Sequence, residues 1–196
     1  MYRLPTKVTV DDLEFNIRER GDFRMVLDCF KALQDEELSE DYRVLASLLI
    51  FYNEFNDFDD LREYESILND LVKEMFEFIN GGEETSPGAE RDVALVDWEQ
   101  DSQLVCAAIN NVANQEIRSV EYMHWWTFLG AYMEIGEGLF SNIIHIRQKK
   151  AKGKKLEKWE QEFYKENKSL IDFQHKEKRS NEEKEMLRDY FGYSKK

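Results

Sequence analysis

Hydrophobic and polar residues alternate at the start of the chain and follow a helical period after it. Residues 7–10, Lys-Val-Thr-Val, and residues 13–17, Leu-Glu-Phe-Asn-Ile, alternate with period two on either side of Asp11 and Asp12. This pattern predicts a β-hairpin whose turn is Asp-Asp. Because two strands alone are only marginally stable, we expect the hairpin to pack on helices or to pair with another chain.

Three helices are predicted to follow the hairpin. The first begins at Asp22, the second covers about 40–55 behind an N-cap at Ser39, and the third begins near Asp59. The second helix is apolar on nearly every side, which predicts a central position. Apolar residues of the third helix recur every three or four positions and are Leu61, Tyr64, Ile67, Leu68, Leu71, Val72, Met75, Phe76 and Ile79.

Glycine-rich residues 81–92 are predicted to form a flexible linker. The linker divides residues 1–80, the hairpin with three helices, from a helical bundle over residues 93–173. Helices of that bundle are expected at about 94–114, 119–136, 139–151 and 155–172. Residues 174–196 are predicted to form a basic amphipathic C-terminal segment, which has a capping-box pattern at Ser180. The predicted fold class is mainly α: an N-terminal β-hairpin followed by a multi-helix bundle.

Composition limits the classes of function. The chain has 196 residues, 42% of them hydrophobic, with only 2 prolines and 9 glycines, which suits long helices around a substantial core. No apolar run is long enough to cross a bilayer, so we expect no membrane partner. Cys29 and Cys106 lie within apolar helical patterns, which indicates reduced thiols in a cytoplasmic protein rather than a disulfide.

Charge is unevenly distributed along the chain, whose net charge is −14. Residues 1–146 hold 11 Lys+Arg against 31 Asp+Glu, a net of −20, and residues 147–196 hold 16 against 10, a net of +6. The basic residues are interspersed with glutamates at helical spacing, and the rest of the chain would repel phosphate. We therefore expect no nucleic-acid partner. The split instead predicts homo-oligomers in which the basic C-terminal segment contacts acidic neighbouring copies head to tail.

Three polar residues, Asp101, His124 and Arg147, interrupt apolar faces of the predicted bundle. Asp101 shares a helix face with Trp98, His124 lies within the second predicted helix of the bundle, and Arg147 continues the line of Phe140. A buried charge is costly unless it is paired. The pattern therefore predicts that Asp101 pairs with Arg147 or His124 inside the bundle.

The sequence contains no constellation typical of catalysis or cofactor binding. A catalytic pair of Asp101 and His124 is the alternative interpretation, but no activated nucleophile, phosphate loop or dinucleotide-binding glycine pattern accompanies it. The histidines and cysteines lack the spacing of a zinc site, and residues 57–60 lack the glycine and glutamate of a calcium loop. We expect no enzymatic activity, no metal and no cofactor.

The tryptophans are concentrated in the second half of the chain. Trp125 and Trp126 are adjacent, so on a helix their side chains project about 100° apart. Either that helix is enclosed on most sides or one indole forms a binding surface, because tryptophan is enriched in interface hot spots. The candidates for partner binding or for the centre of the bundle are Trp98, Asp101, His124, Trp125, Trp126, Arg147 and Trp159.

Several short motifs together resemble a bacteriophage family. They are Asp-Trp-Glu-Gln-Asp at 97–101, His-Trp-Trp-Thr-Phe at 124–128, Ile-Ile-His-Ile-Arg at 143–147, Lys-Lys-Leu at 154–156 and Tyr-Lys-Glu-Asn at 164–167. The hairpin followed by Gly-Asp-Phe-Arg at 21–24 extends the likeness over nearly the whole chain. The motifs resemble the gene-product-fifteen family of long-tailed phages and prophages of Gram-positive bacteria, of the tail assembly chaperone type.

The resemblance implies a role in tail morphogenesis. Genes of this family usually lie between those of the major tail protein and the tape-measure protein. The implied function is a chaperone that binds the tape-measure protein, helps to recruit tail-tube subunits in the host cytoplasm and is absent from the mature virion. The alternatives are a structural tail component retained in the virion and an acidic helical regulator that binds another protein.

Overall fold

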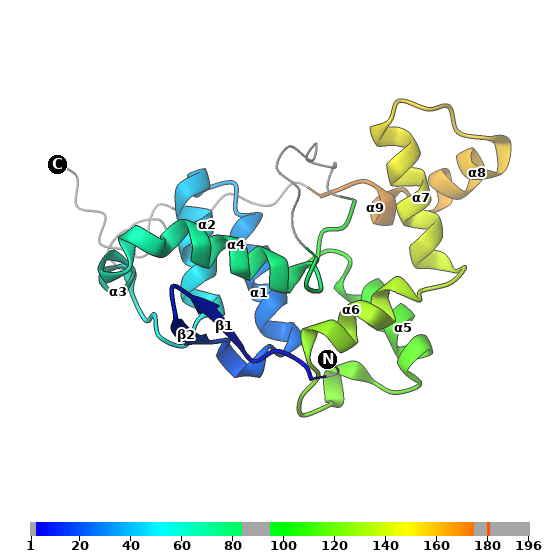
Figure 1. Cartoon of the computed structure of the whole chain (residues 1–196). Coiled ribbons are helices and arrows are strands. Elements are labelled where there is room, and N and C mark those ends of the chain that lie inside the picture. Colours follow the sequence, from blue (N-terminus) through cyan, green and yellow to red (C-terminus); the bar gives the residue numbers. More distant parts are fainter. Residues whose placement is uncertain (1–2, 84–94, 175–179, 181–196) are drawn as a thin grey trace. The chain divides into compact units, whose positions relative to one another are not determined.

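The computed structural model describes residues 3–83, 95–174 and 180, and it divides into two compact units (Figure 1). The described part of the first unit is residues 3–83 and 180, and that of the second is residues 95–174. Each unit is described by itself. The fold is mainly α with a small N-terminal β-hairpin, as predicted. None of the described helices is long and apolar enough to span a membrane.

Two predicted segments lie largely outside the described residues. Residues 84–92 of the predicted linker are outside them. So are residues 175–179 and 181–196 of the predicted C-terminal segment, which include its capping box apart from Ser180.

The first unit begins with the predicted hairpin. Strand β1 (Lys7–Val10) pairs antiparallel with β2 (Leu13–Asn16). Asp11 and Asp12 have φ values of 49° and 63°, the left-handed conformations of a tight two-residue hairpin turn. The alternation in the sequence directs one face inward, and the buried residues of the two strands are Val8, Val10 and Phe15.

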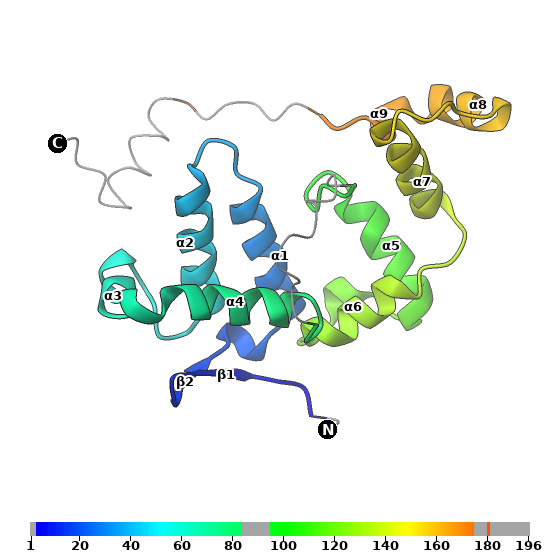
Figure 2. The same ribbon diagram turned by 45° about the horizontal axis from the view of Figure 1, so that its top comes forward.

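Helices α1 (Phe23–Leu33) and α2 (Glu40–Phe51) pack side by side, and Figure 2 shows them as neighbouring columns. The carboxylate of Asp22 accepts the backbone N–H of Arg24 at 3.0 Å and caps α1. Ser39 occupies the predicted N-cap position of α2 but makes no side-chain capping hydrogen bond. Four residues of α2 are buried, which agrees with its predicted central position.

The third predicted helix is broken into three pieces, so the prediction of one continuous helix was wrong. The pieces are α3 (Phe58–Glu63), a 3₁₀ turn η2 (Glu65–Ile67) and α4 (Leu68–Ile79). At the break, the Tyr64 ring lies 5.5 Å from the Phe15 ring in an edge-on contact. Packing of this aromatic side chain against the hairpin accompanies the turn that interrupts the helical period.

The Arg18 side chain donates hydrogen bonds to carbonyl groups at the C-terminal end of α2. One guanidinium nitrogen, Nη2, donates to the carbonyl oxygens of Leu49 at 3.2 Å, Tyr52 at 2.8 Å and Phe55 at 2.8 Å. The last carbonyls of a helix have no partner within the helix, so this arginine satisfies acceptors that would otherwise be buried unpaired. The contact ties the hairpin side of the unit to its helical core.

The second unit contains only helices. They are α5 (Ser102–Ala113), the 3₁₀ turn η3 (Ile117–Ser119), α6 (Trp125–Met133), α7 (Leu139–Ala151), α8 (Lys158–Glu166) and α9 (Lys168–Ile171). Within this unit α7 contacts both α5 and α9. Ile143 and Ile146 of α7 form a fully buried cluster with Ile171, against which Leu104 of α5 packs.

The predicted helix over 139–151 is confirmed, whereas two of its neighbours begin later than predicted. The helix predicted over 94–114 begins at Ser102, because an Asp97 carboxylate oxygen accepts the N–H groups of residues 99 and 100 and closes a separate turn. The helix predicted over 119–136 begins at Trp125, since His124 has extended backbone angles and acts as its N-cap.

The helix predicted over 155–172 is two helices, α8 and α9, which meet at Asn167. The φ of Asn167 is −116°, and its side-chain amide donates to the carbonyl oxygen of Phe163 at 3.0 Å. An asparagine side chain that bonds to the last turn competes with continuation of the helix.

Candidate functional site

Asp101 and Arg147 form a buried ion pair at the centre of the second unit. Nη1 of Arg147 lies 2.5 Å from one carboxylate oxygen of Asp101, and Nη2 lies 2.9 Å from the other. The two side chains are only 1% and 3% exposed. Of the two partners predicted for Asp101, Arg147 is the one that forms the pair.

The remaining N–H groups of Arg147 also have acceptors. Nε donates to the carbonyl oxygen of Ile171 at 2.8 Å, Nη1 to that of Leu95 at 2.9 Å, and Nη2 to that of Leu170 at 2.7 Å. With the two bonds to Asp101, all five guanidinium N–H groups are used. The arginine joins the segment before α5 to α7 and α9, so its role is to hold the unit together and it has no donor left for a ligand.

His124 caps α6. Its Nδ1 accepts the backbone N–H of Trp126 at 3.0 Å, and the residue is 1% exposed. The sequence placed His124 inside a helix, and the structure corrects this position to the residue before the helix. An imidazole that accepts through Nδ1 carries its proton on Nε2 in the neutral form. The capping role explains why a polar residue occurs among aromatic neighbours.

The adjacent indoles of the His-Trp-Trp motif have different environments. Trp125 is 1% exposed and stacks on Phe128 with a centroid distance of 5.4 Å, and its ring also lies 6.5 Å from that of Trp98. Trp126 is only partly buried. Trp125 therefore belongs to the core, and of the two only Trp126 has surface that a partner can contact.

Trp159 lies on α8 in a small polar cluster. It is 49% exposed, and its ring stacks on that of His145 with an interplanar angle of 11°. The His145 ring in turn lies 2.8 Å from a carboxylate oxygen of buried Glu160, and Lys149 Nζ lies 2.5 Å from the same oxygen. The Lys149 ammonium, with the backbone N–H of Glu157 and the imidazole, lowers the pKa of the Glu160 carboxyl to about 2. The buried carboxylate is therefore ionised at neutral pH and organises the start of α8.

A groove of about 280 Å³ lies between α5 and the turn that joins α6 to α7. Its walls are mostly apolar or small and comprise Leu104, Ala107, Ala108, Asn111, Val112, Ile135, Gly136, Glu137, Gly138, Leu139, Phe140 and Ser141. Val112 and Leu139 are 40% and 45% exposed, and Met133 at the end of α6 is 74% exposed. Apolar side chains left open at one place on a surface are typical of a protein-binding site.

Two glycines in the wall of the groove are not required by the chain's own packing. A Cβ atom placed on Gly136 or Gly138 would have no neighbouring atom within 4 Å. The φ of Gly138 is 169°, an extended conformation open to any residue, and that of Gly136 lies outside the left-handed range. The missing side chains keep the groove open although the fold has space for them.

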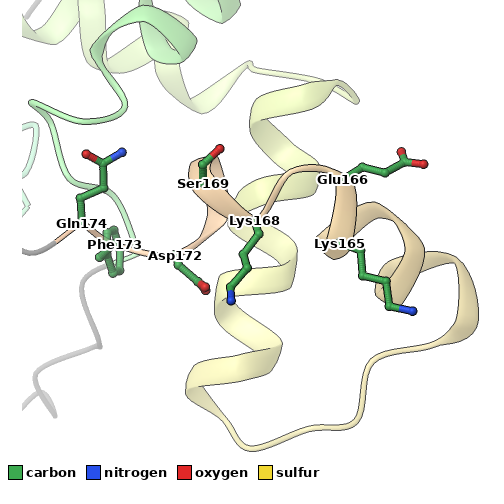
Figure 3. Close-up of a pocket in the computed structure, with 7 residues that line it drawn as sticks. All are labelled: Lys165, Glu166, Lys168, Ser169, Asp172, Phe173 and Gln174. Carbon is green, nitrogen blue, oxygen red and sulfur yellow. The ribbon is translucent and has the colours of Figure 1, made fainter.

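A second, larger depression of about 500 Å³ is lined by residues of α8, α9 and the segment after them. Figure 3 labels its lining residues, which are Lys165, Glu166, Lys168, Ser169, Asp172, Phe173 and Gln174. The side chains point in different directions along the ribbon and do not converge on one point (Figure 3). This arrangement does not define a binding site for a small ligand.

Comparison with known protein families identifies one match. The family model described as bacteriophage Gp15 protein matches residues 2–173. The chain belongs to this family. Comparison with curated proteins gives no match, and comparison with solved structures gives none either. The match contains the hairpin and every described helix, so the phage family predicted from the motifs is confirmed.

The described residues of this Gp15 family member include many potential metal ligands and two cysteines. Across residues 3–83 and 95–174, no group of three or more His, Cys, Asp or Glu side chains is placed to hold a metal ion. Both cysteines are present as thiols. Burial raises the pKa of the Cys29 thiol well above its usual value and raises that of half-buried Cys106 as well. Neither has the lowered pKa of an activated nucleophile.

Sequence reasoning missed the groove in this Gp15 family member. Its walls come from residues 104–112 and 135–141, which lie more than 20 positions apart, and only packing of the helices brings them together. The available signal was the pair Gly136 and Gly138 between two helices, which reads as an ordinary turn. The cluster around Glu160 was missed for a similar reason, because Glu160 lies on α8 whereas its side-chain partners His145 and Lys149 lie on α7.

Proposed function

We propose that this protein is a tail assembly chaperone that binds the tape-measure protein and helps to recruit tail-tube subunits. The groove beside α5 is the observation that carries the proposal. A tape-measure protein exposes apolar helical stripes until the tube encloses it, and such stripes aggregate when they are not covered. A partner helix lays apolar side chains spaced three and four residues apart into a groove of this kind.

The glycines make this groove suitable for a backbone that approaches closely. Gly136, Gly138, Ala107 and Ala108 keep side-chain volume low along the walls, while Val112 and Leu139 supply apolar contact at the rim. Neither glycine is needed for internal packing, and their small size leaves room for another molecule in the groove.

Net charge supports the same function. Residues 3–83 contain 9 Lys+Arg against 21 Asp+Glu, a net of −12. Strong like charge on the outside of a chaperone keeps coated complexes apart through electrostatic repulsion. Membership in a phage family supports a phage protein as the partner, and we infer long-tailed phages of Gram-positive hosts as its source.

The proposal includes a non-enzymatic role without cofactor or nucleic acid, in the host cytoplasm and not in the mature virion. The competing possibility is a structural tail protein. Mass spectrometry of purified particles distinguishes the two: peptides of a chaperone are absent, and peptides of a structural component are present in proportion to the other tail proteins.

The direct test is co-expression with the tape-measure protein encoded beside it. We expect the tape-measure protein to aggregate when expressed alone and to remain in solution and co-purify when the full chain is present. Failure of the wild-type chain to co-purify with it or to keep it in solution would overturn the proposed function.

A matched pair of variants tests the groove itself. Gly136→Gln places a bulky polar side chain in the groove, and Gly130→Gln places the same side chain on the exposed surface of α6, where a Cβ also has no neighbour within 4 Å. We expect Gly136→Gln to weaken binding of the tape-measure protein by on the order of tenfold or more, as loss of a central contact does. Gly130→Gln should bind like the wild type. Equal binding by both variants would reject the groove as the site while leaving the function in place.

A further inference from the structure

Three lysines are exposed on the loop between α7 and α8, which extends from the end of α7 in Figure 1, and a fourth exposed lysine is the first residue of α8. They are Lys152, Lys154, Lys155 and Lys158, and residues 152–159 are called the lysine loop here. In the described part of the chain none of the four has an ion-pair partner, whereas the preceding Lys149 and Lys150 pair with Glu160 and Asp172. Four unpaired ammonium groups within seven residues repel each other and attract an acidic partner.

Trp159 ends the lysine loop and gives it an apolar anchor. Its indole N–H donates to a Glu157 carboxylate oxygen at 3.2 Å, and its ring lies parallel to that of His145. These contacts orient the ring while 49% of the residue remains exposed. An oriented, half-exposed tryptophan surrounded by charged side chains is typical of the centre of a protein interface.

The first unit offers the complementary charge. Residues 57–70, called the acidic segment here, contain six Asp or Glu and one basic residue, Arg62, whose guanidinium lies 2.5 Å from Asp59. Glu63, Glu65 and Asp70 are exposed and have no ion-pair partner among the described residues. The segment includes α3, which lies at the edge of the first unit in both views (Figures 1 and 2).

We propose that the lysine loop of one copy of this protein binds the acidic segment of a second copy. The contact joins two different surfaces, so each copy presents one of each and the association is head to tail. The sequence predicts such an association through residues 174–196, and the lysine loop is a second basic surface, one that lies within the described residues. The inference concerns self-association and does not depend on the tape-measure protein.

A second copy fits the loop better than a nucleic acid does. One face of the Trp159 ring stacks on His145, which leaves a single face on which a base could stack. Glu157 lies within the loop, and the chain as a whole has a net charge of −14. A phosphate backbone would be repelled by most of the molecule, whereas the acidic segment is part of every copy.

Charge reversal in the full chain tests the proposal. The loop variant Lys154→Glu with Lys155→Glu should lose self-association, and so should the segment variant Glu63→Lys with Glu65→Lys and Asp70→Lys. The control is Lys165→Glu with Lys168→Glu, which changes the net charge of the same unit by the same amount at exposed lysines outside the loop. Sedimentation velocity at several protein concentrations measures association, and circular dichroism with tryptophan fluorescence verifies that each variant is folded.

Mixing the two defective variants provides the decisive measurement. In the loop variant the lysine loop has a net charge of −1 and the acidic segment one of −5. In the segment variant the lysine loop keeps its net charge of +3 and the segment has one of +1, so each variant repels itself and attracts the other. We expect the equimolar mixture to associate although neither variant does so alone. For the wild type, raising NaCl from about 50 mM to about 500 mM should weaken association on the order of tenfold, because salt screens exposed charges.

Three results would overturn the proposal. One is a wild-type chain that stays monomeric at all concentrations in low salt, which would indicate that the loop contacts its own first unit or nothing. Another is association that survives both charge reversals. The third is association that disappears after nuclease treatment, which would assign the loop to nucleic acid.

Discussion

At the scale of single residues, the sequence pattern predicted that Asp101 has a buried partner, and packing of the fold adds further hydrogen bonds to that partner, Arg147. Both residues interrupt apolar faces, and the cost of an unpaired buried charge is sufficient to predict a partner for each. The carbonyl oxygens of Leu95, Leu170 and Ile171, which take up the other donors, have no signature in the sequence. Every residue has such a carbonyl, and only the tertiary fold selects these three.

Glu160 is a residue whose importance the sequence conceals. It occurs on a helix with many glutamates, yet it alone among them is buried beside Lys149 and His145. Its second carboxylate oxygen accepts the backbone N–H of Glu157 at 2.6 Å, which makes it part of the cap of α8. A buried carboxylate with these donors is stabilised in its charged form.

This environment predicts a pH-dependent effect of Glu160→Gln. The pKa of the Glu160 carboxyl is about 2 in the folded protein, against 4.5 for an unperturbed glutamate. The ionised carboxylate therefore stabilises the fold at pH above about 4.5, and this stabilisation is lost as the pH falls toward 2. We expect the variant to have a lower Tm than the wild type at pH 6, and the difference to shrink by pH 3. Thermal unfolding followed by tryptophan fluorescence measures it.

Glu162→Gln is the control, since Glu162 is an exposed glutamate on the same helix. Its Tm should follow that of the wild type at both pH values. A Tm difference for Glu160→Gln that is the same at pH 3 as at pH 6 would contradict the assigned role of the ionised carboxylate.

At the scale of elements, the sequence predicted which helices are present better than it predicted where each helix begins and ends. The helix over 139–151 was correct to the residue, because a capping turn before Leu139 and a basic last turn both occur there. The third predicted helix was wrong because hydrophobic periodicity continued through Tyr64 although the backbone turned. Periodicity reports which side chains are buried and does not report whether they share one straight axis.

The start of α6 allows a prediction at this scale. His124→Ala and His124→Asn both shorten the side chain, but only asparagine keeps an acceptor that can cap the N–H of Trp126. We expect the alanine variant to be less stable than the asparagine variant by about 1 kcal/mol, the typical value of an N-cap. Urea denaturation of the two proteins gives the difference, and equal stabilities would show that capping is not what His124 contributes.

At the scale of the whole molecule, the unfolding of each unit can be followed by its own side chains. All four tryptophans lie within residues 95–174, so their fluorescence follows only the second unit. Cys29 lies buried in the first unit, where its raised pKa and lack of exposure protect it from thiol reagents until that unit opens. In a Cys106→Ala background, Cys29 is the sole thiol and reports the first unit alone.

These reporters predict that damage to one unit leaves the other intact. Arg147→Lys retains a charge but cannot supply five donors, so the unfolding free energy of the second unit should fall by about 3 kcal/mol, near the lower end for a broken buried pair. The midpoint of the fluorescence transition in urea should fall accordingly, while the urea dependence of Cys29 labelling stays unchanged. Arg118→Lys, at an exposed pair with Glu116, should alter neither transition appreciably. A parallel shift of both transitions would mean that the units unfold together.

The sequence by itself determined the mainly helical class, the hairpin with its Asp-Asp turn, the membership in a phage family and the pairing of Asp101. The family membership follows from the resemblance of short motifs. The other three follow from local periodicity, turn chemistry and the cost of burying charge, which act on neighbours in the chain or on single residues. The tertiary structure decided where helices break, which of Trp125 and Trp126 is buried, and that residues 104–112 and 135–141 form a groove. Those features depend on contacts between segments distant in sequence, and a hydrophobic pattern records that a residue is buried without recording what buries it.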